Sequence, residues 1–178
     1  DATMDLSSVD GSNVFRLDGV AVGDFSGRSV SSAGDVNGDG FDDLIVGAHR
    51  ASPNGSHSGS SYVVFGKAAG FSATTNLSSL DGNSGFRLDG EKELDYSGTS
   101  VSGAGDVNGD GFDDLIIGAD GADNPSGNHT PSGFGSSYVI FGRSDFGGSD
   151  VIAGTPDDDN LTGTSAAERF EAGDGNDR

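Results

Sequence analysis

The feature of this sequence that most restricts its fold is an internal duplication. Residues 6–19, LSSVDGSNVFRLDG, return as LSSLDGNSGFRLDG at residues 77–90, a shift of 71 residues. The same shift relates residues 24–48 to the second copy, and it grows to 76 near the end of the unit because the second copy carries five extra residues in a loop. Two copies of one supersecondary unit are typical of repeat architectures, in which neighbouring units bury each other's apolar faces.

Each copy contains four short runs that are rich in β-branched and aromatic residues and are bounded by Gly, Asp, Asn and Ser. We expect strands at 14–18, 29–34, 43–48 and 60–66 in the first copy and at 85–89, 100–105, 114–119 and 136–142 in the second. No helical period is evident. The runs at 43–48 and 114–119 show no polar alternation, so we expect them to be buried on both faces between neighbouring sheets.

The pattern predicts an all-β fold made of β-propeller blades, with one four-stranded sheet for each repeat. Residues 1–149 form the repeat region, divided at about 6–76 and 77–149, and residues 150–178 have a different sequence texture.

The charge of the chain restricts its partners. Nine basic residues stand against 29 acidic ones, for a formal net charge of −20, so nucleic acid and anionic membrane surfaces are disfavoured and divalent cations are favoured. No apolar run is long enough to span a bilayer. The sequence contains no cysteine, so no disulfide can stabilise it, and bound metal is the expected substitute.

The sequence DVNGDGFDD occurs at residues 35–43 and again at 106–114. Calcium takes roughly six to eight oxygen ligands, and alternate side chains of a tight loop can surround one side of the ion. Glycine at the sixth position permits the sharp turn. The predicted ligands are the side chains of Asp35, Asn37, Asp39 and Asp43 with the carbonyl oxygen of Phe41, and the side chains of Asp106, Asn108, Asp110 and Asp114 with the carbonyl oxygen of Phe112.

Two other features of these loops matter. Asp42 and Asp113, at the eighth position, are expected to face solvent or to make loop hydrogen bonds, and are not expected to be ligands. An EF-hand is excluded because its twelfth position, a glutamate, is here Val46 or Ile117 within a predicted strand.

The loops are followed directly by LIVGA or LIIGA and preceded by FSG or YSG, and this combination resembles the FG-GAP repeat of integrin α-subunit propellers and their bacterial relatives. The resemblance covers residues 6–142. It implies that each loop joins two strands of a blade and holds structural Ca²⁺, so two calcium sites are expected. The sequence departs from the family where His49 and Asp120 replace the proline of GAP and where a serine separates Phe from Gly.

From about Val151 a nine-residue period begins, and its last turn reads AGDGND. Residues 150–178 resemble a degenerate and truncated form of the glycine-rich calcium repeat of RTX (hemolysin-type) proteins. The resemblance implies turns of a parallel β-roll, a weak or incomplete calcium site and secretion by a type I route.

A PxGxH pattern recurs at 53–57 and 125–129. A ligand or transition-metal role and a solvated turn are both compatible with it, and the solvated turn is favoured because a metal would need a third ligand. These loops are expected at the end of the blades opposite the calcium loops, and that end is expected to meet a protein partner or a glycan. The residues expected there are His49, Arg50, His57, Glu91, Lys92, His129 and Phe134.

No nucleophile, base and orienting acid can be picked out, so we do not expect an enzyme. The sequence favours a non-enzymatic, calcium-binding, extracellular or cell-surface propeller module that serves adhesion or protein–protein interaction. The alternatives are an ancillary carbohydrate- or substrate-targeting domain of a larger secreted enzyme and a scaffold subunit of a larger assembly.

Propellers close with roughly four to eight blades, and two repeats supply only two. The predicted strand order leaves an extra outer strand at the start and a last sheet without its outer strand. These ends are complementary, so we expect closure by a homo-oligomer of three or four copies, or by a missing part of a longer parent chain.

Overall fold

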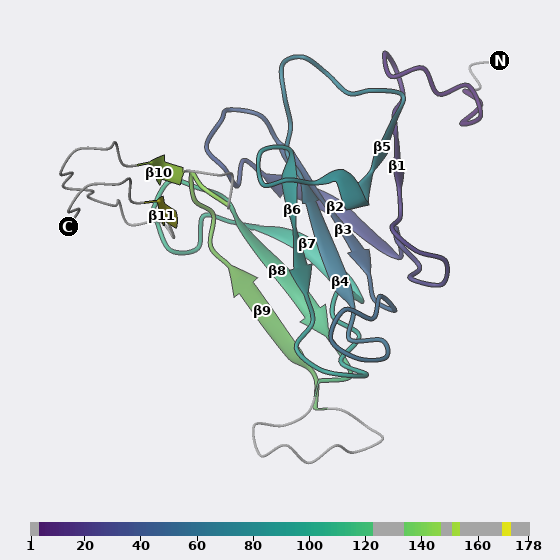
Figure 1. The fold of residues 1–178 in the computed structure, drawn as a ribbon, viewed down its shortest axis with the longest axis vertical. Coiled ribbons are helices and arrows are strands. Elements are labelled where there is room, and N and C mark those ends of the chain that lie inside the picture. Colours follow the sequence, from purple (N-terminus) through teal and green to yellow (C-terminus); the bar gives the residue numbers. More distant parts are fainter. Residues whose placement is uncertain (1–3, 123–133, 147–150, 154–168, 172–178) are drawn as a thin grey trace.

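The computed structural model describes residues 4–122, 134–146, 151–153 and 169–171, the last two ranges as backbone only. The described chain is all-β, apart from a single 3₁₀ turn, η1 (Leu77–Ser79), as Figure 1 shows. The all-β fold predicted from the repeats is therefore confirmed.

The first sheet contains four antiparallel strands in the order β2 (Ser29–Gly34), β3 (Asp43–Ala48), β4 (Ser60–Val64) and β6 (Gly85–Asp89). Three consecutive strands come from the first copy, and the outer strand comes from the start of the second copy. This is the strand order of a propeller blade, and it is the order predicted from the sequence.

The second sheet contains β7 (Ser100–Gly105), β8 (Asp114–Ala119) and β9 (Ser136–Ile140), again antiparallel and in chain order. Within the described residues no strand pairs with the outer edge of β9. The second sheet therefore matches the first without its outer strand, as the sequence predicted.

The first predicted strand is present as β1 (Arg16–Asp18), which pairs in parallel with β5 (Thr74–Asn76). Neither β5 nor η1 was predicted from the sequence. A side-chain oxygen of Asn76 accepts a hydrogen bond from the Ser78 N–H at 2.9 Å and caps η1.

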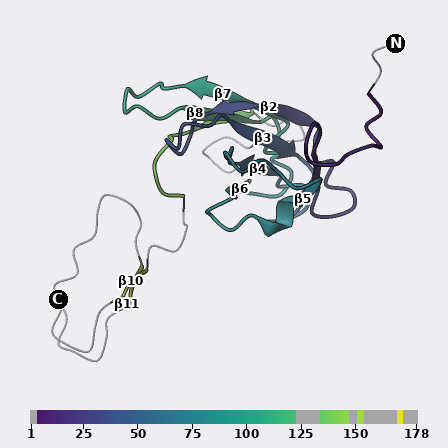
Figure 2. The same cartoon turned by 90° about the horizontal axis from the view of Figure 1, so that it is seen from above.

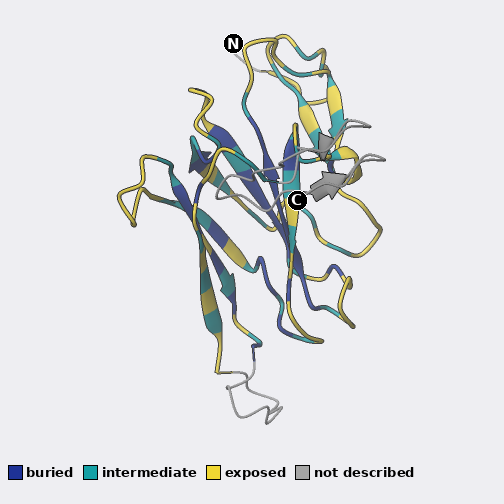
Figure 3. Ribbon diagram, turned by 60° about the vertical axis from the view of Figure 1, so that its left-hand side comes forward, coloured by how far each residue is buried: buried dark blue, intermediate teal, exposed yellow. Residues whose placement is uncertain are grey.

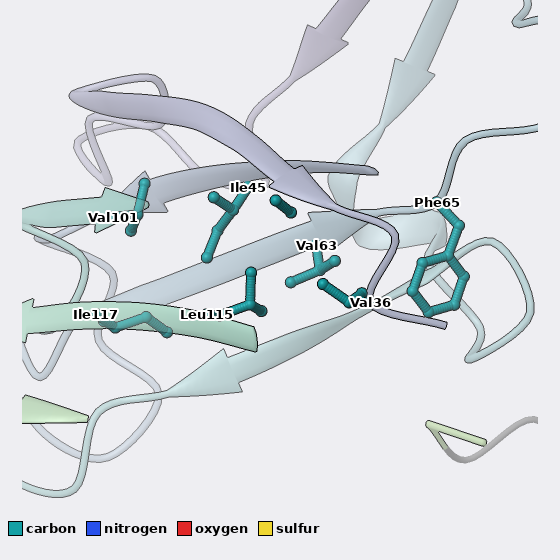
Figure 4. Close-up of a cluster of buried hydrophobic side chains, with 8 residues drawn as sticks. Val36, Ile45, Val63, Phe65, Val101, Leu115 and Ile117 are labelled. Carbon is teal, nitrogen blue, oxygen red and sulfur yellow. The ribbon is translucent and has the colours of Figure 1, made fainter. Parts of the chain in front are cut away.

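The main core lies between the two sheets (Figure 4). It contains Ala33, Val36, Ile45, Val63, Phe65, Val101, Leu115 and Ile117. Figure 2 shows β2 and β7 side by side across this layer, and the backbone N–H of Val101 donates to the Ser29 hydroxyl at 3.0 Å between them. The two sheets therefore stack face to face and bury one apolar surface of each.

A second core covers the other face of the first sheet and contains Val46, Ala48, Ala51, Tyr62, Val64 and Leu77. Because Ile45 and Val46 face opposite cores, β3 is buried on both faces, as predicted. The same prediction is wrong for β8, where Ile116 is exposed, because no described segment covers its side of the second sheet (Figure 3).

Two aromatic stacks repeat the same relationship in both copies. The ring of Phe15 stacks on Phe71 at 4.1 Å with an interplanar angle of 8°, and Phe86 stacks on Phe146 at 4.2 Å and 6°. Each stack joins the FRLDG motif of one copy to the segment after the last strand of that copy. β1 therefore lies against the first sheet as β6 lies against the second.

In the tail, β10 (Val151–Ala153) pairs in parallel with β11 (Arg169–Glu171), at an offset of 18 residues. This offset equals two of the nine-residue periods seen in the sequence. The rest of the predicted RTX-like segment, including its proposed calcium turn, lies outside the described residues.

Candidate metal centres in two equivalent loops

The two DVNGDGFDD loops connect β2 to β3 and β7 to β8, as predicted. In the first loop the carboxylate of Asp35 accepts hydrogen bonds from the N–H groups of Gly38 at 2.8 Å, Asp39 at 3.0 Å and Gly40 at 2.9 Å. The two glycines have φ angles of 75° and 87°, in the left-handed region that other residues avoid. The first aspartate therefore organises the whole turn.

The side chains at the third and fifth positions bond to each other. Asn37 accepts the Asp39 N–H at 3.0 Å through Oδ1 and donates to the Asp39 carboxylate at 3.0 Å through Nδ2. The other Asp39 oxygen accepts the N–H of Phe41 at 2.9 Å. Asn108 and Asp110 repeat these contacts in the second loop, and Asp106 repeats those of Asp35.

The ninth position lies beneath the loop. Asp43 is fully buried, and its carboxylate accepts the Val36 N–H at 3.0 Å and the Gly66 N–H at 2.8 Å. Burial raises the pKa of Asp43 to about 6, against the effect of these two hydrogen bonds, and the nearby charges of Asp39 and Asp35 raise it further. The carboxylate fixes the start of the loop to the end of β4.

Asp114 occupies the same place in the second loop. It is fully buried and accepts the Val107 N–H and the Gly142 N–H, both at 2.8 Å. The structure thus builds the two candidate centres with the same hydrogen bonds, although they belong to different sheets.

The seventh-position residues differ in their packing. Phe41 is exposed, whereas the ring of Phe112 lies over Gly38 of the first loop and leaves no room for a side chain there. This contact joins the two candidate centres across the boundary between the sheets.

The donor set of each loop suits calcium, because every predicted ligand atom is a carboxylate, amide or carbonyl oxygen. In the described conformation these side-chain oxygens accept hydrogen bonds from backbone N–H groups, and one oxygen of Asp35 and one of Asp106 accept two such bonds each. Across the described part of the chain, no group of three or more His, Cys, Asp or Glu side chains is gathered around one point. The residues fit a calcium ion in donor chemistry and in their spacing along the sequence, whereas in the described conformation the loops are ordered by hydrogen bonds to their own backbone N–H groups.

The eighth position has a role that the sequence analysis missed. The Asp113 carboxylate accepts the Asp35 N–H at 2.9 Å, and the Asp113 N–H donates to the Asp35 carbonyl at 3.1 Å. Asp113 therefore makes a loop hydrogen bond, as expected, but its partner is the other loop, which was not predicted. The available signal was the repetition of an aspartate at a position that the metal does not require.

At the opposite end of the first sheet, several predicted surface residues come together. The ring of Tyr96 lies 6.3 Å from His49 and 5.7 Å from His57, and Arg50 lies 4.9 Å from the ring centre of Phe25. The loop after β3 and the loop after β6 are joined there by a hydrogen bond from the Leu94 N–H to the Ser56 carbonyl at 2.8 Å.

Three further predicted residues of that end, Glu91, Lys92 and Phe134, are exposed, and His129 lies outside the described residues. Phe25 and Tyr96, which the sequence analysis did not include, occupy equivalent positions in the two copies. Both have positive φ angles, 56° and 54°.

No helix in the described ranges is long and apolar enough to span a membrane.

The comparisons with known proteins agree with this architecture. Residues 26–64 and 97–140 each match the model of the FG-GAP repeat. The chain is 35% identical over 93 residues to integrin alpha-2 of Mus musculus, and the aligned region covers 52% of this chain and 7% of that protein. It is 34% identical over 117 residues to integrin alpha-3 of Cricetulus griseus, covering 64% and 10%. A third relative, integrin alpha-PS5 of Drosophila melanogaster, is 36% identical over 97 residues, covering 54% and 9%.

The matched region is thus a tenth or less of the length of these relatives. The two matched segments contain the two stacked sheets. Residues 26–64 and 97–140 are similar to FG-GAP repeats, and the sheets that they form are β-propeller blades.

Proposed function

We propose that this chain is a non-enzymatic, calcium-stabilised, extracellular propeller module that serves adhesion or protein–protein interaction. The similarity of both repeats to integrin α subunits supports the class of function and the extracellular location. Export by a type I route belongs to the same proposal, and it is supported by the resemblance of residues 150–178 to RTX repeats.

The observation that carries the calcium proposal is the charge of the two loops. Each loop has four aspartates in nine residues and no basic residue. In the described part of the chain, the ion pairs join Arg16 to Asp18 and Arg87 to Asp89, so no loop carboxylate has a cationic side chain within salt-bridge distance. Closely spaced carboxylates repel each other, and a bound cation removes that repulsion.

The first site would use the side chains of Asp35, Asn37, Asp39 and Asp43 with the Phe41 carbonyl, and the second site the equivalent residues of the second loop. A bound Ca²⁺ supplies positive charge and fixed oxygen coordination. Asp43 and Asp114 already connect each loop to the end of the third strand of its sheet. The loops would therefore transmit metal binding to the stability of each blade.

Thermal unfolding in calcium and after chelation tests this proposal. Asp39→Ala and Asp110→Ala should each reduce the calcium-dependent rise in Tm, because each removes a proposed ligand. Asp42→Ala is the matched control, since it removes a loop aspartate at a position outside the ligand set. An equal response to calcium in all four proteins would contradict the proposal.

For the partner, we propose the end of the first sheet that carries His49, Arg50, His57 and Tyr96. It combines two loops from different repeats with the exposed side chains of Arg50 and Phe25 and a half-buried group of His49, His57 and Tyr96. Loops of this kind, held on a rigid sheet, are where proteins usually present binding residues.

A further inference from the structure

We propose that the face of the second sheet that no described segment covers binds the first sheet of a second copy of this chain, so that copies add head to tail as successive blades. We call this face the open face and define it by Ile116, Val139 and Phe141. The inference goes beyond the proposed function and does not depend on calcium, because it rests on the contacts between the two sheets.

The open face is apolar and exposed, whereas its equivalent in the first sheet is buried. Ile116, Val139 and Phe141 are 38%, 47% and 52% exposed. Their equivalents in the first copy are Ile45, Val63 and Phe65, which are 0%, 0% and 6% exposed because the second sheet covers them. Ile116 and Val139 are also direct cross-strand partners, so the exposed side chains form one continuous patch.

On the other side of the two-sheet stack, a valine of the first sheet is exposed although its equivalent in the second sheet is buried. Val101 is 7% exposed because it packs against the first sheet, but its equivalent Val30 is 65% exposed. Val30 pairs across the strands with Val46, which is buried with Leu77 in the second core, so the exposed part of this face is the part at Val30. We call this exposed surface at Val30 the receiving face. Within one chain, the equivalent of the receiving face on the second sheet packs against the equivalent of the open face on the first sheet. This contact is the template for the proposed contact between two copies.

Hydrogen bonds also join the two sheets of one chain, and the equivalent residues on the outer faces could form the same bonds between two copies. Between the sheets, Asp113 bonds to the Asp35 backbone, and the Arg143 N–H donates to the Val36 carbonyl at 2.9 Å. The equivalent of Asp113 is Asp42, which is exposed, and the equivalent of Asp35 is Asp106. In a second copy stacked in the same way, Asp42 would bond to the Asp106 backbone of the first.

The outer strands support the same assignment. β6 pairs with β4 in the register Ser60↔Asp89 to Val64↔Gly85, and Phe86 packs 5.8 Å from Phe65. β9 has the sequence SSYVI, close to the SSYVV of β4, and its outer edge lacks a partner among the described strands.

β1 carries the same FRLD sequence as β6 and is set against the first sheet by the equivalent aromatic stack. Stacking a second copy on the open face would bring its β1 beside β9 and its Phe15 to the exposed Phe141. This pairing between β1 and β9 would run from Asp18 to Phe15. It would end there because the equivalent of the next residue, Val14, is Gly85 in β6. Gly85 has a φ of 139° and lies against the Val63 carbonyl, with no room for a Cβ.

The test is the mass of the full 178-residue chain in solution, measured by light scattering across a range of protein concentration. We expect masses that rise with concentration to multiples of 17.8 kDa, and that rise further in high salt, because salt screens the repulsion between chains of net charge −20. A folded chain that stays monomeric at every concentration and salt level would overturn the proposal.

Two variants test the head-to-tail arrangement. Val139→Asp destroys the open face and Val30→Asp destroys the receiving face, so each variant alone should be monomeric. A mixture of the two should form dimers and nothing larger, since each partner keeps one intact face. Val22→Asp, at a fully exposed valine outside both faces, is the control and should assemble as the unchanged chain does.

Circular dichroism and Tm would establish that each variant is folded. Retention of the full assembly by folded Val139→Asp and Val30→Asp would contradict the assignment of the faces. Because masses can be measured with and without calcium, failure of this proposal is distinguishable from failure of the calcium proposal, which is read from Tm.

Discussion

The carboxylate of Asp113 accepts the backbone N–H of Asp35 at 2.9 Å, across the boundary between the two blades. Asp35 is also the residue that organises the first loop, through hydrogen bonds from Gly38, Asp39 and Gly40. One loop thus contacts the other through an aspartate that is not among its candidate ligands. The stability of the first candidate metal loop is therefore coupled to the stacking of the second blade.

This relationship predicts that Asp113→Ala is destabilising. The change removes a charged acceptor from a partly buried N–H, which should lower the free energy of unfolding by about 1–3 kcal/mol. Urea unfolding at concentrations where the chain is monomeric measures the effect. Asp42→Ala is the matched control, and it should change the free energy of unfolding by no more than about 0.5 kcal/mol, because Asp42 is exposed. Equal effects of the two changes would contradict a stabilising role for the hydrogen bond between Asp113 and the Asp35 backbone.

A second prediction concerns two equivalent glycines. A Cβ on Gly47 would collide with the backbone carbonyl of Gly98, in the loop that enters the second blade, whereas a Cβ on Gly118 would meet the hydroxyl of Ser100. A backbone carbonyl cannot rotate away, but a serine side chain can. We expect Gly47→Ala to lower the free energy of unfolding by about 1–3 kcal/mol and Gly118→Ala to cost less. Thermal unfolding compares them, and a larger loss of Tm for Gly118→Ala would refute this account of blade contact.

A third prediction concerns pH. Burial lowers the pKa of His49 below its usual value, and the nearby charges of Arg50 and Arg28 lower it further. A base whose pKa is lower in the folded state favours folding when it is neutral. Its contribution is therefore complete above the unfolded pKa of about 6.5 and is lost as the pH falls below that value. Its Nδ1 is buried without a hydrogen-bond partner, so protonation would leave a buried N–H unpaired.

The measurement is Tm between about pH 7.5 and 6. The raised pKa of Asp43, about 6, lies at the lower end of this window and makes an opposite contribution, so the effect of His49 is read from the difference between two proteins. On acidification, His49→Gln should lose less stability than the unchanged chain. His57→Gln is the control, because His57 lies in the same aromatic group but on a different loop. An identical pH dependence in the unchanged chain and His49→Gln would show that the imidazole of His49 is not responsible.

Much of the fold could be predicted because the duplication shows the same strand signals twice. The residues of β2, β3, β6, β7 and β8 are those expected from the sequence, and β4 and β9 end two residues early. The strand β5 could not be predicted, since Thr74–Asn76 is short and polar and its strand conformation depends on parallel pairing with β1. Such pairing between distant segments leaves no local periodicity.

The exposure of Ile116 shows a second limit. Its sequence context is nearly identical to that of Ile45, yet one is exposed and the other is buried. The second sheet covers Ile45, and no described segment covers Ile116, so the difference depends on tertiary packing and not on the local sequence. The candidate loops were located by their spacing, but the link from Asp113 to Asp35 required the stacked arrangement of the two sheets.

The central claim is that each DVNGDGFDD loop holds one calcium ion, and isothermal titration of calcium into the chelated full chain tests it most directly. The account predicts that Asp39→Ala and Asp110→Ala each remove one bound ion and that the double variant removes both, while Asp42→Ala removes none. A folded chain that binds no calcium, or that binds the same number of ions in the double variant, would contradict it.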